Sequence, residues 1–345
     1  MILVIGTAFV LKGMAEIVEE TTGVLSKRTK LAGGMLQSIG TAFPDMALGV
    51  VAAVVSLRLV KTDYLGAVNF AIIAAATTFG SNIYNIGYAI WALFRQNMAN
   101  SLKKQIKIIP FLNAGMVTPI KDQKVKPHIK ELNVSIRVLT VLTLLTAVVA
   151  GSMVIFGKIQ SPPVGMSGDL YQLIKPAGIV IFLLCILVMW IFRKNHRPEE
   201  SQEIIREEKY FEKQSMGIIF LYLFFAGVTI LLAAEAMVNA ISVLCVITGL
   251  PTVVAGVMAG LIGCLGEIIT IHNFTINPEG RLGDAVVGVA MDNVVTMMGA
   301  SIVAMMGGIF LGGTALILIF VFILMLNTML IEQISKLKDA YIVIQ

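Results

Sequence analysis

The sequence predicts an all-α polytopic membrane protein, with two inverted-topology repeats of about five helices each and broken helices at the midplane. Three observations predict this class: the composition, a series of long apolar segments, and an internal repeat. Of the 345 residues, 57% are hydrophobic and only 14% are charged, whereas soluble domains carry about 25% charged residues. This composition is typical of a chain that crosses a bilayer many times.

Nine apolar segments approach or exceed the roughly 20 residues that a membrane-spanning helix needs. They cover residues 2–15, 31–57, 65–94, 138–157, 176–192, 216–244, 251–272, 283–310 and 313–331. The first is short for a span. A transmembrane β-barrel would instead show alternating patterns of about ten residues, which the sequence lacks. The three cysteines are scattered through apolar segments and predict neither a disulfide framework nor a metal site.

Lysine and arginine predict the orientation of these segments. If the connections alternate sides, one side receives the basic stretches 27–30, 95–137 and 193–213 and the C-terminal tail. The other side receives only Arg58, Lys61, Lys158 and Lys175. Because basic residues favour cytoplasmic loops, we expect a multi-pass protein of the cell membrane with its N-terminus outside and its C-terminus cytoplasmic. The net charge of +5 therefore reflects topology and does not indicate nucleic-acid binding.

Two pairs of segments repeat within the chain. The stretch KLAGGMLQSIGTAFPDMALG, from position 30, resembles TVVAGVMAGLIGCLGEIITI, from position 252, and aligns Asp45 with Glu267. Downstream, Asn82 aligns with Asn293. The first copy enters from outside and the second from the cytoplasm, so the copies have opposite topology. Inverted repeats with interrupted helices are typical of secondary transporters, whose binding site lies near the midplane.

The repeat divides the chain into three parts. Residues 1–192 form the first half, with its core motif at 30–95. Residues 193–215 form a cytoplasmic charged linker, and residues 216–345 form the second half, with its core motif at 251–310.

The motifs in these repeats resemble those of the sodium/calcium exchanger family of the calcium/cation antiporter superfamily. The first repeat reads GTAFPD at 40–45 and GSNIYN at 80–85. The second matches in part, with IGCLGE at 262–267 and MDNVVT at 291–296. The resemblance covers roughly residues 1–95 and 216–310. Family members usually have ten helices, one more than the nine segments counted here, so one helix is either lost or beyond the end of the chain.

The resemblance implies a secondary active antiporter that exchanges Ca²⁺ or a similar cation for Na⁺ by alternating access. It implies no catalytic activity and no cofactor other than the transported ions. The partners would be the lipid bilayer and small cations, with no nucleic acid, and the protein would act as a monomer. The first helix of each repeat, at 2–20 and 216–244, would slide or rock against the core.

Three acids lie inside apolar segments: Asp45, Glu267 and Asp292. A carboxylate at this depth is costly unless it is paired or binds a cation, and the basic residues lie at segment ends. Hard cations prefer oxygen ligands. Neutral oxygens lie one helical turn from these acids or from each other, at Thr41, Ser81, Asn85 and Thr296. A helix break at Gly40 and Pro44 would free carbonyl oxygens, and the resemblance implies carbonyl ligands at Ser38 and Gly260.

The second repeat departs from the family pattern. The family commonly has serine at the position of Asp292 and an acid or amide at that of Thr296, so acid and hydroxyl are exchanged across one turn. Gly263, Cys264 and Gly266 replace the family's Thr, Ser and Pro. The three acids could balance three Na⁺, or Ca²⁺ with one H⁺, so the coupling ion stays open.

Several alternatives remain open at this point. The protein could be a proton-coupled exchanger or a transport-impaired relative of the family. An intramembrane metal-dependent enzyme is a more distant alternative, because His128, His196 and His272 all lie in loops or at segment edges. Asn82 and Asn293 could join helices by hydrogen bonds rather than contact an ion. Glu235 could be a proton site or a water-facing acid.

Overall fold

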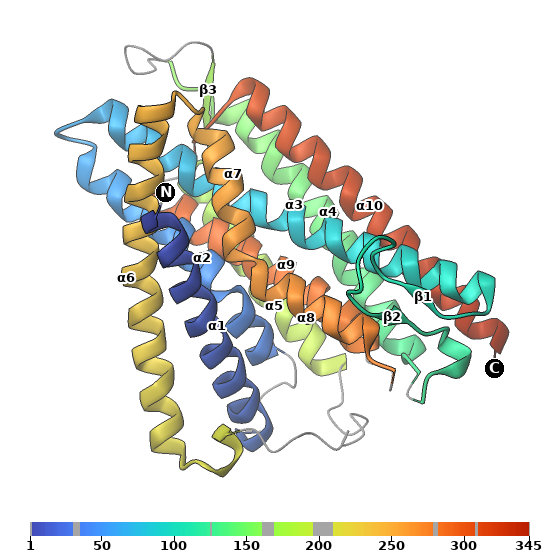
Figure 1. Ribbon diagram of the computed structural model, residues 1–345. Helices are drawn as coiled ribbons and strands as arrows, with labels where there is room; N and C mark the ends of the chain where they lie inside the picture. Colours follow the sequence, from blue (N-terminus) through green and yellow to red (C-terminus); the bar gives the residue numbers. More distant parts are fainter. Residues whose placement is uncertain are drawn as a thin grey trace.

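The computed structural model describes residues 2–29, 35–124, 126–160, 169–195, 210–278, 282–307 and 310–344. Its first half contains helices α1 (Ile2–Thr29), α2 (Met35–Leu59), α3 (Tyr64–Leu102), α4 (Ile129–Phe156) and α5 (Lys175–Asn195). Its second half contains α6 (Met216–Thr248), α7 (Thr252–Gly263), α8 (Leu265–Ile276), α9 (Leu282–Met305) and α10 (Gly313–Ile344). The all-α class is confirmed, with five helices in each half (Figure 1).

In the described residues, each predicted apolar segment falls mainly in a helix or a broken helix. Among the described residues, six helices are long and apolar enough to cross a membrane, and the bent pair α7–α8 makes a seventh candidate. The apolar part of α5, Lys175–Ile191, is shorter. The first apolar segment begins α1, a helix of 28 residues that runs on through the polar stretch after Ala15. In agreement with the expectation that this segment is short for a span, α1 is not among the candidate spans.

A helix break occurs in only one of the two predicted places. In the second half, α7 and α8 meet at Cys264 with a bend of 47°. In the first half, α2 runs without interruption through Pro44, so the predicted break at Gly40 and Pro44 is wrong. Proline still has no N–H to donate to the carbonyl of the residue four before it. The Gly40 carbonyl therefore lacks its usual helical donor although the helix continues.

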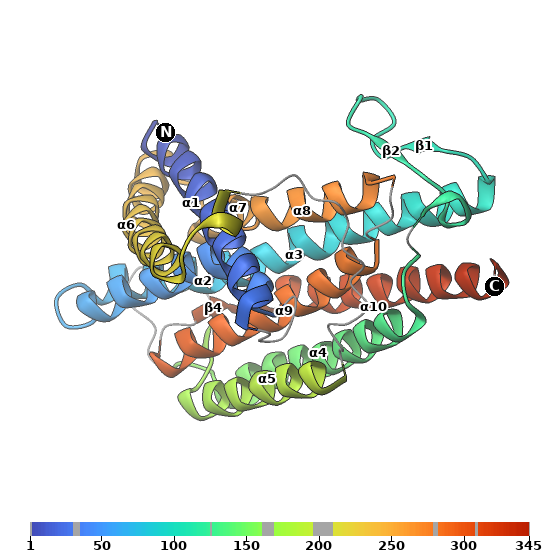
Figure 2. The ribbon, with the colours of Figure 1, turned by 90° about the horizontal axis from the view of Figure 1, so that it is seen from below.

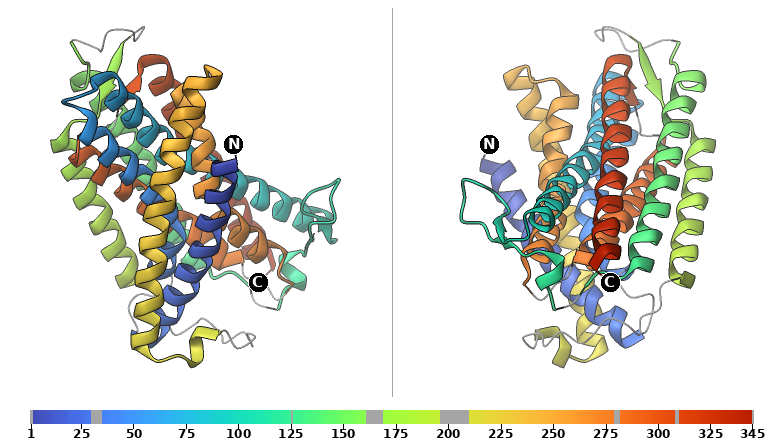
Figure 3. Two further views of the ribbon diagram at one scale, coloured as in Figure 1. Left: turned by 60° about the vertical axis from the view of Figure 1, so that its left-hand side comes forward. Right: turned by 90° about the vertical axis from the view of Figure 1, so that its right-hand side faces the viewer.

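The helix packing has the pseudo-symmetry of an inverted repeat. Helices α1 and α6 pack on each other along one edge of the molecule (Figure 2). In the remainder, α2 packs on α9 and α7 packs on α3, while α4 packs on α9 and α10 packs on α3. In the inverted repeat, α1 corresponds to α6, α2 to α7–α8, α3 to α9, and α4 to α10. Under this correspondence the contact of α2 with α9 becomes that of α7 with α3, and the contact of α4 with α9 becomes that of α10 with α3. The crossed pairs interleave the two halves into one body, in which α4 and α10 lie side by side (Figure 3).

Connections that the sequence assigns to the same side of the membrane contact one another. On one side, β3 (Leu170–Gln172) pairs antiparallel with β4 (Phe310–Gly312). On the other, Arg28 donates to the carbonyls of Glu212 and Gln214, beside the 3₁₀ turn η3 (Tyr210–Lys213). The hairpin of β1 (Ile106–Lys107) and β2 (Met116–Val117), followed by the 3₁₀ turn η1 (Ile120–Asp122), lies on this second side near the end of α8. Most of the predicted linker, residues 196–209, lies outside the described residues.

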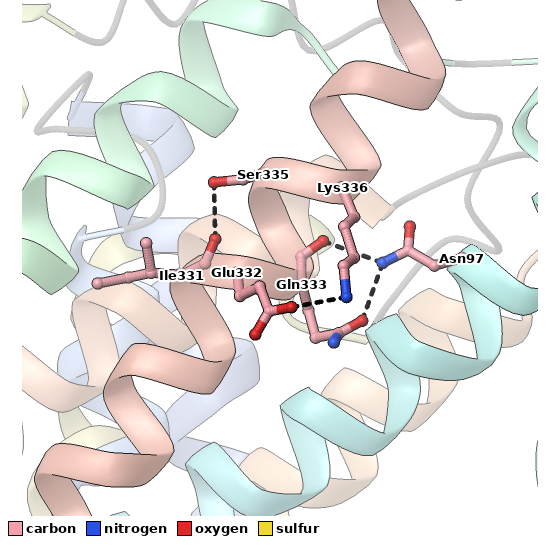
Figure 4. Close-up of polar contacts among 6 residues, drawn as sticks. All are labelled: Asn97, Ile331, Glu332, Gln333, Ser335 and Lys336. Atoms are coloured by element: carbon pink, nitrogen blue, oxygen red, sulfur yellow. Dashed lines mark hydrogen bonds and ion pairs between the residues drawn. The ribbon is translucent and has the colours of Figure 1, made fainter.

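Hydrogen bonds between Asn97 and Gln333, here called the polar clasp, join the C-terminal part of α3 to α10. Asn97 Nδ2 donates to both the backbone carbonyl and the Oε1 of Gln333, at 3.0 and 3.1 Å (Figure 4). Around it, Lys336 pairs with Glu332 at 2.7 Å and Ser335 donates back to the Ile331 carbonyl. The clasp fixes the register of two long helices that the turns alone would not set.

Candidate ion-binding site

The three predicted acids meet where α2, α8 and α9 cross. Asp45 lies in α2, Glu267 in the first turn of α8, and Asp292 in α9. Their exposed fractions are 1%, 2% and 6%. Glu267 is close enough to the other two carboxylates for charge repulsion to act between them. The fold thus brings acids from both repeats, 247 positions apart at the extremes (292 − 45), into one buried region.

Each acid accepts a hydrogen bond from one of the predicted neutral residues. Ser81 Oγ donates to Asp45 Oδ2 at 2.5 Å. Asn85 Nδ2 donates to Glu267 Oε2 at 2.6 Å.

The third bond runs from Thr41 Oγ1 to Asp292 Oδ1 at 3.0 Å. Like the bond from Asn85, it crosses between the repeats, so the site exists only when both halves are packed together. Thr296 Oγ1 instead donates to the Asp292 backbone carbonyl at 3.0 Å, which leaves its oxygen lone pairs free to accept.

Several buried oxygens in this region have no hydrogen-bond donor among the described residues. They are Asp45 Oδ1, Glu267 Oε1, Asn85 Oδ1 and Thr77 Oγ1. Buried polar atoms in folded proteins are nearly always paired, so such a group of acceptors needs an explanation. Within the described chain, neither Asp45 nor Glu267 forms an ion pair, so no lysine or arginine there balances these charges. A bound cation is the kind of partner that acceptors without donors require.

Thr77 is a residue that the sequence reasoning missed. It is 1% exposed and lies one helical turn before Ser81 on α3. The spacing of Thr77, Ser81 and Asn85 is i, i+4, i+8, which places three polar side chains on one face of a helix. That periodicity was visible in the sequence and would have identified Thr77.

Close backbone packing between α3 and α7 positions the bend beside Asp45. A Cβ added at Gly260 would lie 2.6 Å from the Thr77 carbonyl and 2.7 Å from the Ser81 nitrogen. A Cβ at Gly263 would lie 3.0 Å from Asp45 Oδ1. Glycine at these positions lets α7 lie directly on α3, and this contact sets where Cys264 and the start of α8 fall.

The sequence predicts carbonyl ligands at Gly260 and Ser38, and the structure gives a contact only for the Gly260 carbonyl. The Gly260 carbonyl accepts the Cys264 N–H at 3.0 Å within the end of α7. Ser38 lies within α2, and its side chain is outside the described residues. Glu267 gains from its place in the first turn of α8, because the positive end of a helix dipole stabilises a carboxylate by about 0.3–1 kcal/mol.

The acids alone do not form a metal centre. In the parts of the chain that the structure covers, no group of three or more His, Cys, Asp or Glu side chains is arranged to hold a metal ion. An ion in this region would be completed by hydroxyl and amide oxygens, which are the groups hydrogen-bonded to the acids.

Two other polar residues considered in the sequence, Glu235 and His272, have partners outside this group of acids. Glu235 forms an ion pair with Arg58 at 3.4 Å, and its side chain is 44% exposed. His272 Nε2 lies 2.8 Å from the Ala114 carbonyl and its Nδ1 2.5 Å from the Tyr88 hydroxyl. Because a carbonyl only accepts, Nε2 carries the proton and Nδ1 accepts from Tyr88. Both residues join surface elements rather than approach the acids.

The arrangement of these helices is shared with proteins of known structure. No protein-family model matches the sequence, and no curated protein matches it. Among solved structures, the H⁺/Ca²⁺ exchanger CAX superposes with a TM-score of 0.63 at 12% identity, covering 99% of this chain and 90% of that one. YfkE gives 0.57 at 13%, covering 100% and 91%. The sodium-calcium exchanger NCX_Mj, soaked with Na⁺ and Sr²⁺, gives 0.52 at 13%, covering 99% and 97%.

These likenesses extend over the whole chain and define a class: a helical membrane protein with the inverted-repeat fold of cation exchangers. The fold that the predicted resemblance implies is confirmed by these structures.

Proposed function

We propose that the protein is a secondary active antiporter that exchanges Ca²⁺ or a similar cation for Na⁺ or H⁺ by alternating access. One observation carries the proposal: carboxylates from both repeats are buried together, and Asp45 Oδ1 and Glu267 Oε1 are left without a donor in the described chain. Shared fold with Ca²⁺ exchangers supports the ion class.

The ligands would be drawn from both halves. Asp45 and Glu267 would be the central ligands, with Asp292 third. Oxygens of Thr41, Ser81, Asn85 and Thr296, with the carbonyls of Ser38 and Gly260, would complete the shell, and we add Thr77 to this set. Hard divalent cations take six to eight oxygens, and this set offers enough of them.

Exchange would follow from the cost of an empty site. Leaving a carboxylate buried without a partner costs several kcal/mol, so a carrier with three acids would reorient only when cations or protons fill it. Either ion load would satisfy the site, and the two loads would compete for the same oxygens. The gradient of one ion would then drive the other.

The moving elements would be α1 and α6. They pack mainly on each other and on α2. A Cβ added at Gly227 of α6 would lie 3.9 Å from the Phe43 ring, so the two helices are not tightly interlocked at this point. This apolar interface lies directly beside Pro44 and Asp45. Sliding of the α1–α6 pair across α2 would open the acids to one side of the membrane and then to the other.

The proton is the second candidate for the coupling ion. It is favoured by the loss of hydroxyl oxygens at Gly263 and Cys264, because a site with fewer oxygens coordinates Na⁺ less completely. A proton needs only one carboxylate oxygen.

Transport by purified protein in sealed vesicles tests the proposal. Ca²⁺ movement would be followed under an opposing Na⁺ gradient, under an opposing pH gradient without Na⁺, and without any gradient. We expect gradient-driven Ca²⁺ movement in the wild type, loss of it in Glu267→Gln, and normal movement in Glu235→Gln. Comparing the Na⁺ and pH arms identifies the coupling ion. The same assay would be run with Mg²⁺ and with Mn²⁺, and absence of movement of all three cations under both gradients would refute the proposal.

A further inference from the structure

A second buried polar region lies against a different face of α3 and α9 from the one that meets the acids. It is a small cavity between α3, α4, α9 and α10, the four helices that interleave the two repeats. Its lining consists of Asn82, Ile86, Leu142, Thr146, Asn293, Met297, Ile323 and Asn327. The cavity offers about 10 Å³ to the centre of a water molecule, which is room for one water.

The position of this cavity follows from helix geometry. Asn82 follows Ser81 directly, and Asn293 follows Asp292 directly. Consecutive residues in an α-helix point about 100° apart, since 3.6 residues make a turn. Ser81 and Asp292 therefore face the acid region, while the next residue on each helix faces the cavity.

The lining is built from matched pairs in the two repeats. On α3, residues 82 and 86 are four apart, and on α9 the equivalent residues 293 and 297 are also four apart. On α4, residues 142 and 146 are four apart, and on α10 residues 323 and 327 match them. The cavity thus lies on the pseudo-two-fold axis that relates the repeats, and each repeat contributes the same pattern.

The polar atoms of this lining are not satisfied by the described chain. Asn82 Oδ1, Asn293 Oδ1, Asn293 Nδ2 and Asn327 Oδ1 have no hydrogen-bond partner there. The three asparagines are only 3–4% exposed. Thr146 is satisfied separately, because its hydroxyl donates to the Leu142 carbonyl at 2.8 Å. Leaving buried polar groups unpaired costs about 1–3 kcal/mol each, so the cavity needs an occupant that both donates and accepts.

Water fits this lining better than a cation does. Among the described residues, no carboxylate lines the cavity, and the Asn293 amide nitrogen presents hydrogens that repel a cation. A water molecule can donate to Asn82 Oδ1 and Asn327 Oδ1 and accept from Asn293 Nδ2. It would then hydrogen-bond to α3, α9 and α10 together.

We infer that this cavity is a binding site for one ordered water molecule, which joins the two repeats by hydrogen bonds to Asn82, Asn293 and Asn327. The clasp of Asn97 on Gln333 holds α10 against α3 along the same interface (Figure 4). Together they bind α3, α9 and α10 into one rigid unit. This inference does not depend on the proposed transport function.

A high-resolution structure of the full chain tests the occupant directly. Data collected in Na⁺ buffer and in choline buffer without Na⁺ should both show one density peak within hydrogen-bond distance of Asn82, Asn293 and Asn327. Two results would overturn the inference: an empty cavity with the amides bonded directly to one another, or a peak that disappears when Na⁺ is withdrawn.

Thermal unfolding of variants tests whether the three helices share one hydrogen-bonded network. Asn82→Val and Asn293→Val should each lower Tm by about 2–4 °C, because each leaves the water and its remaining partners incompletely bonded. The double variant should cost clearly less than the sum, since the second substitution removes groups already unpaired.

The matched control is Asn97→Val, which removes a polar contact on the same helix about 22 Å away (15 residues at 1.5 Å each). Its effect should add to that of Asn82→Val, as expected for distant sites. The shared water would be refuted if the losses of Tm added in the Asn82/Asn293 double variant as fully as they do in the Asn82/Asn97 control.

Discussion

Asp45 and Glu267 occupy matched places in the two repeats, yet their surroundings differ. Asp45 lies within an unbroken helix and accepts from Ser81 of its own repeat. Glu267 lies in the first turn of a helix and accepts from Asn85 of the other repeat. Glu267 therefore depends on both the α7–α8 bend and the packing between halves. It is the acid at which loss of charge is most informative.

Glu267→Gln should show separately how the buried charge affects the stability of the ion-free protein and how it affects stabilisation by a bound cation. Glutamine keeps the shape and can still bond to Asn85, so the ion-free protein should be as stable as the wild type or more so, because the cost of the buried charge is gone. At a cation concentration 100 times Kd, the wild type should gain about 2.7 kcal/mol of stability. A variant that binds a hundredfold more weakly should gain only about 0.4 kcal/mol there (RT ln 2).

Thermal unfolding with and without Ca²⁺, Mn²⁺, Mg²⁺ and Na⁺ measures both quantities. Glu235→Gln is the matched control, because it removes a half-exposed acid from a surface ion pair. It should leave the ion-dependent gain unchanged. An undiminished gain in Glu267→Gln would remove Glu267 from the site.

At the residue scale, the sequence predicted most of the residues around the acids, but it did not predict all of them. The three acids and the donors Thr41, Ser81 and Asn85 do come together in the structure. They could be predicted because an isolated acid in an apolar segment is a strong signal of a buried site. Thr77 was missed, since a threonine in an apolar helix is unremarkable alone. Ser81 and Asn82 point in different directions because consecutive residues of a helix lie about 100° apart. Which neighbouring helix each of them meets depends on how α3 packs, and the sequence does not show this.

At the scale of elements, the bend lies in the repeat whose motif has Gly266 where the first repeat has Pro44. Pro44 removes one donor from α2, and a long helix packed on several sides tolerates that loss. In the second repeat the glycines at 260, 263 and 266 lower helix propensity together, and the contact of α7 with α3 fixes where the chain turns. The sequence identified residues that could break a helix, but packing decided which of them do so. Helix α1 runs beyond its apolar segment into a polar stretch and packs on α6, and hydropathy alone does not predict this extension.

Gly260→Ala should show how closely α7 must approach α3. The new Cβ would lie 2.6 Å from the Thr77 carbonyl and 2.7 Å from the Ser81 nitrogen, and neither backbone atom can move aside as a flexible side chain would. We expect a loss of about 1–3 kcal/mol of stability and weaker cation-dependent stabilisation, because α7 and the start of α8 must shift away from Asp45.

The control for this change is Gly288→Ala in α9, where an added Cβ meets nothing within 4 Å. Alanine there should stabilise the helix by about 0.5–1 kcal/mol. Thermal unfolding compares the two variants. If Gly260→Ala were as well tolerated as Gly288→Ala, close α3–α7 packing would not be what positions the bend.

At the scale of the whole molecule, the two ends are distinguished by their connections. The β3–β4 pair lies at one end, with the turn between α2 and α3 assigned to the same side by the alternation of spans. The β1–β2 hairpin and the contact of Arg28 with the η3 segment lie on the other side. The alternation of spans could be predicted because it needs only hydropathy and a count. Pairing of distant strands such as β3 and β4 could not, because each has three residues and no pattern of its own.

Labelling of introduced cysteines should establish which end faces the cytoplasm. The three native cysteines are buried, so a membrane-impermeant maleimide should react with them little. Phe111 lies at the exposed tip of the β1–β2 hairpin, with an exposed fraction of 95%, and Thr62 lies in the exposed turn between α2 and α3. Because the hairpin connection carries many lysines, the positive-inside rule places it in the cytoplasm. Thr62→Cys should therefore react in intact cells and Phe111→Cys only after the membrane is opened. The reverse pattern would invert the orientation, and reaction of both in intact cells would contradict the alternation of spans itself.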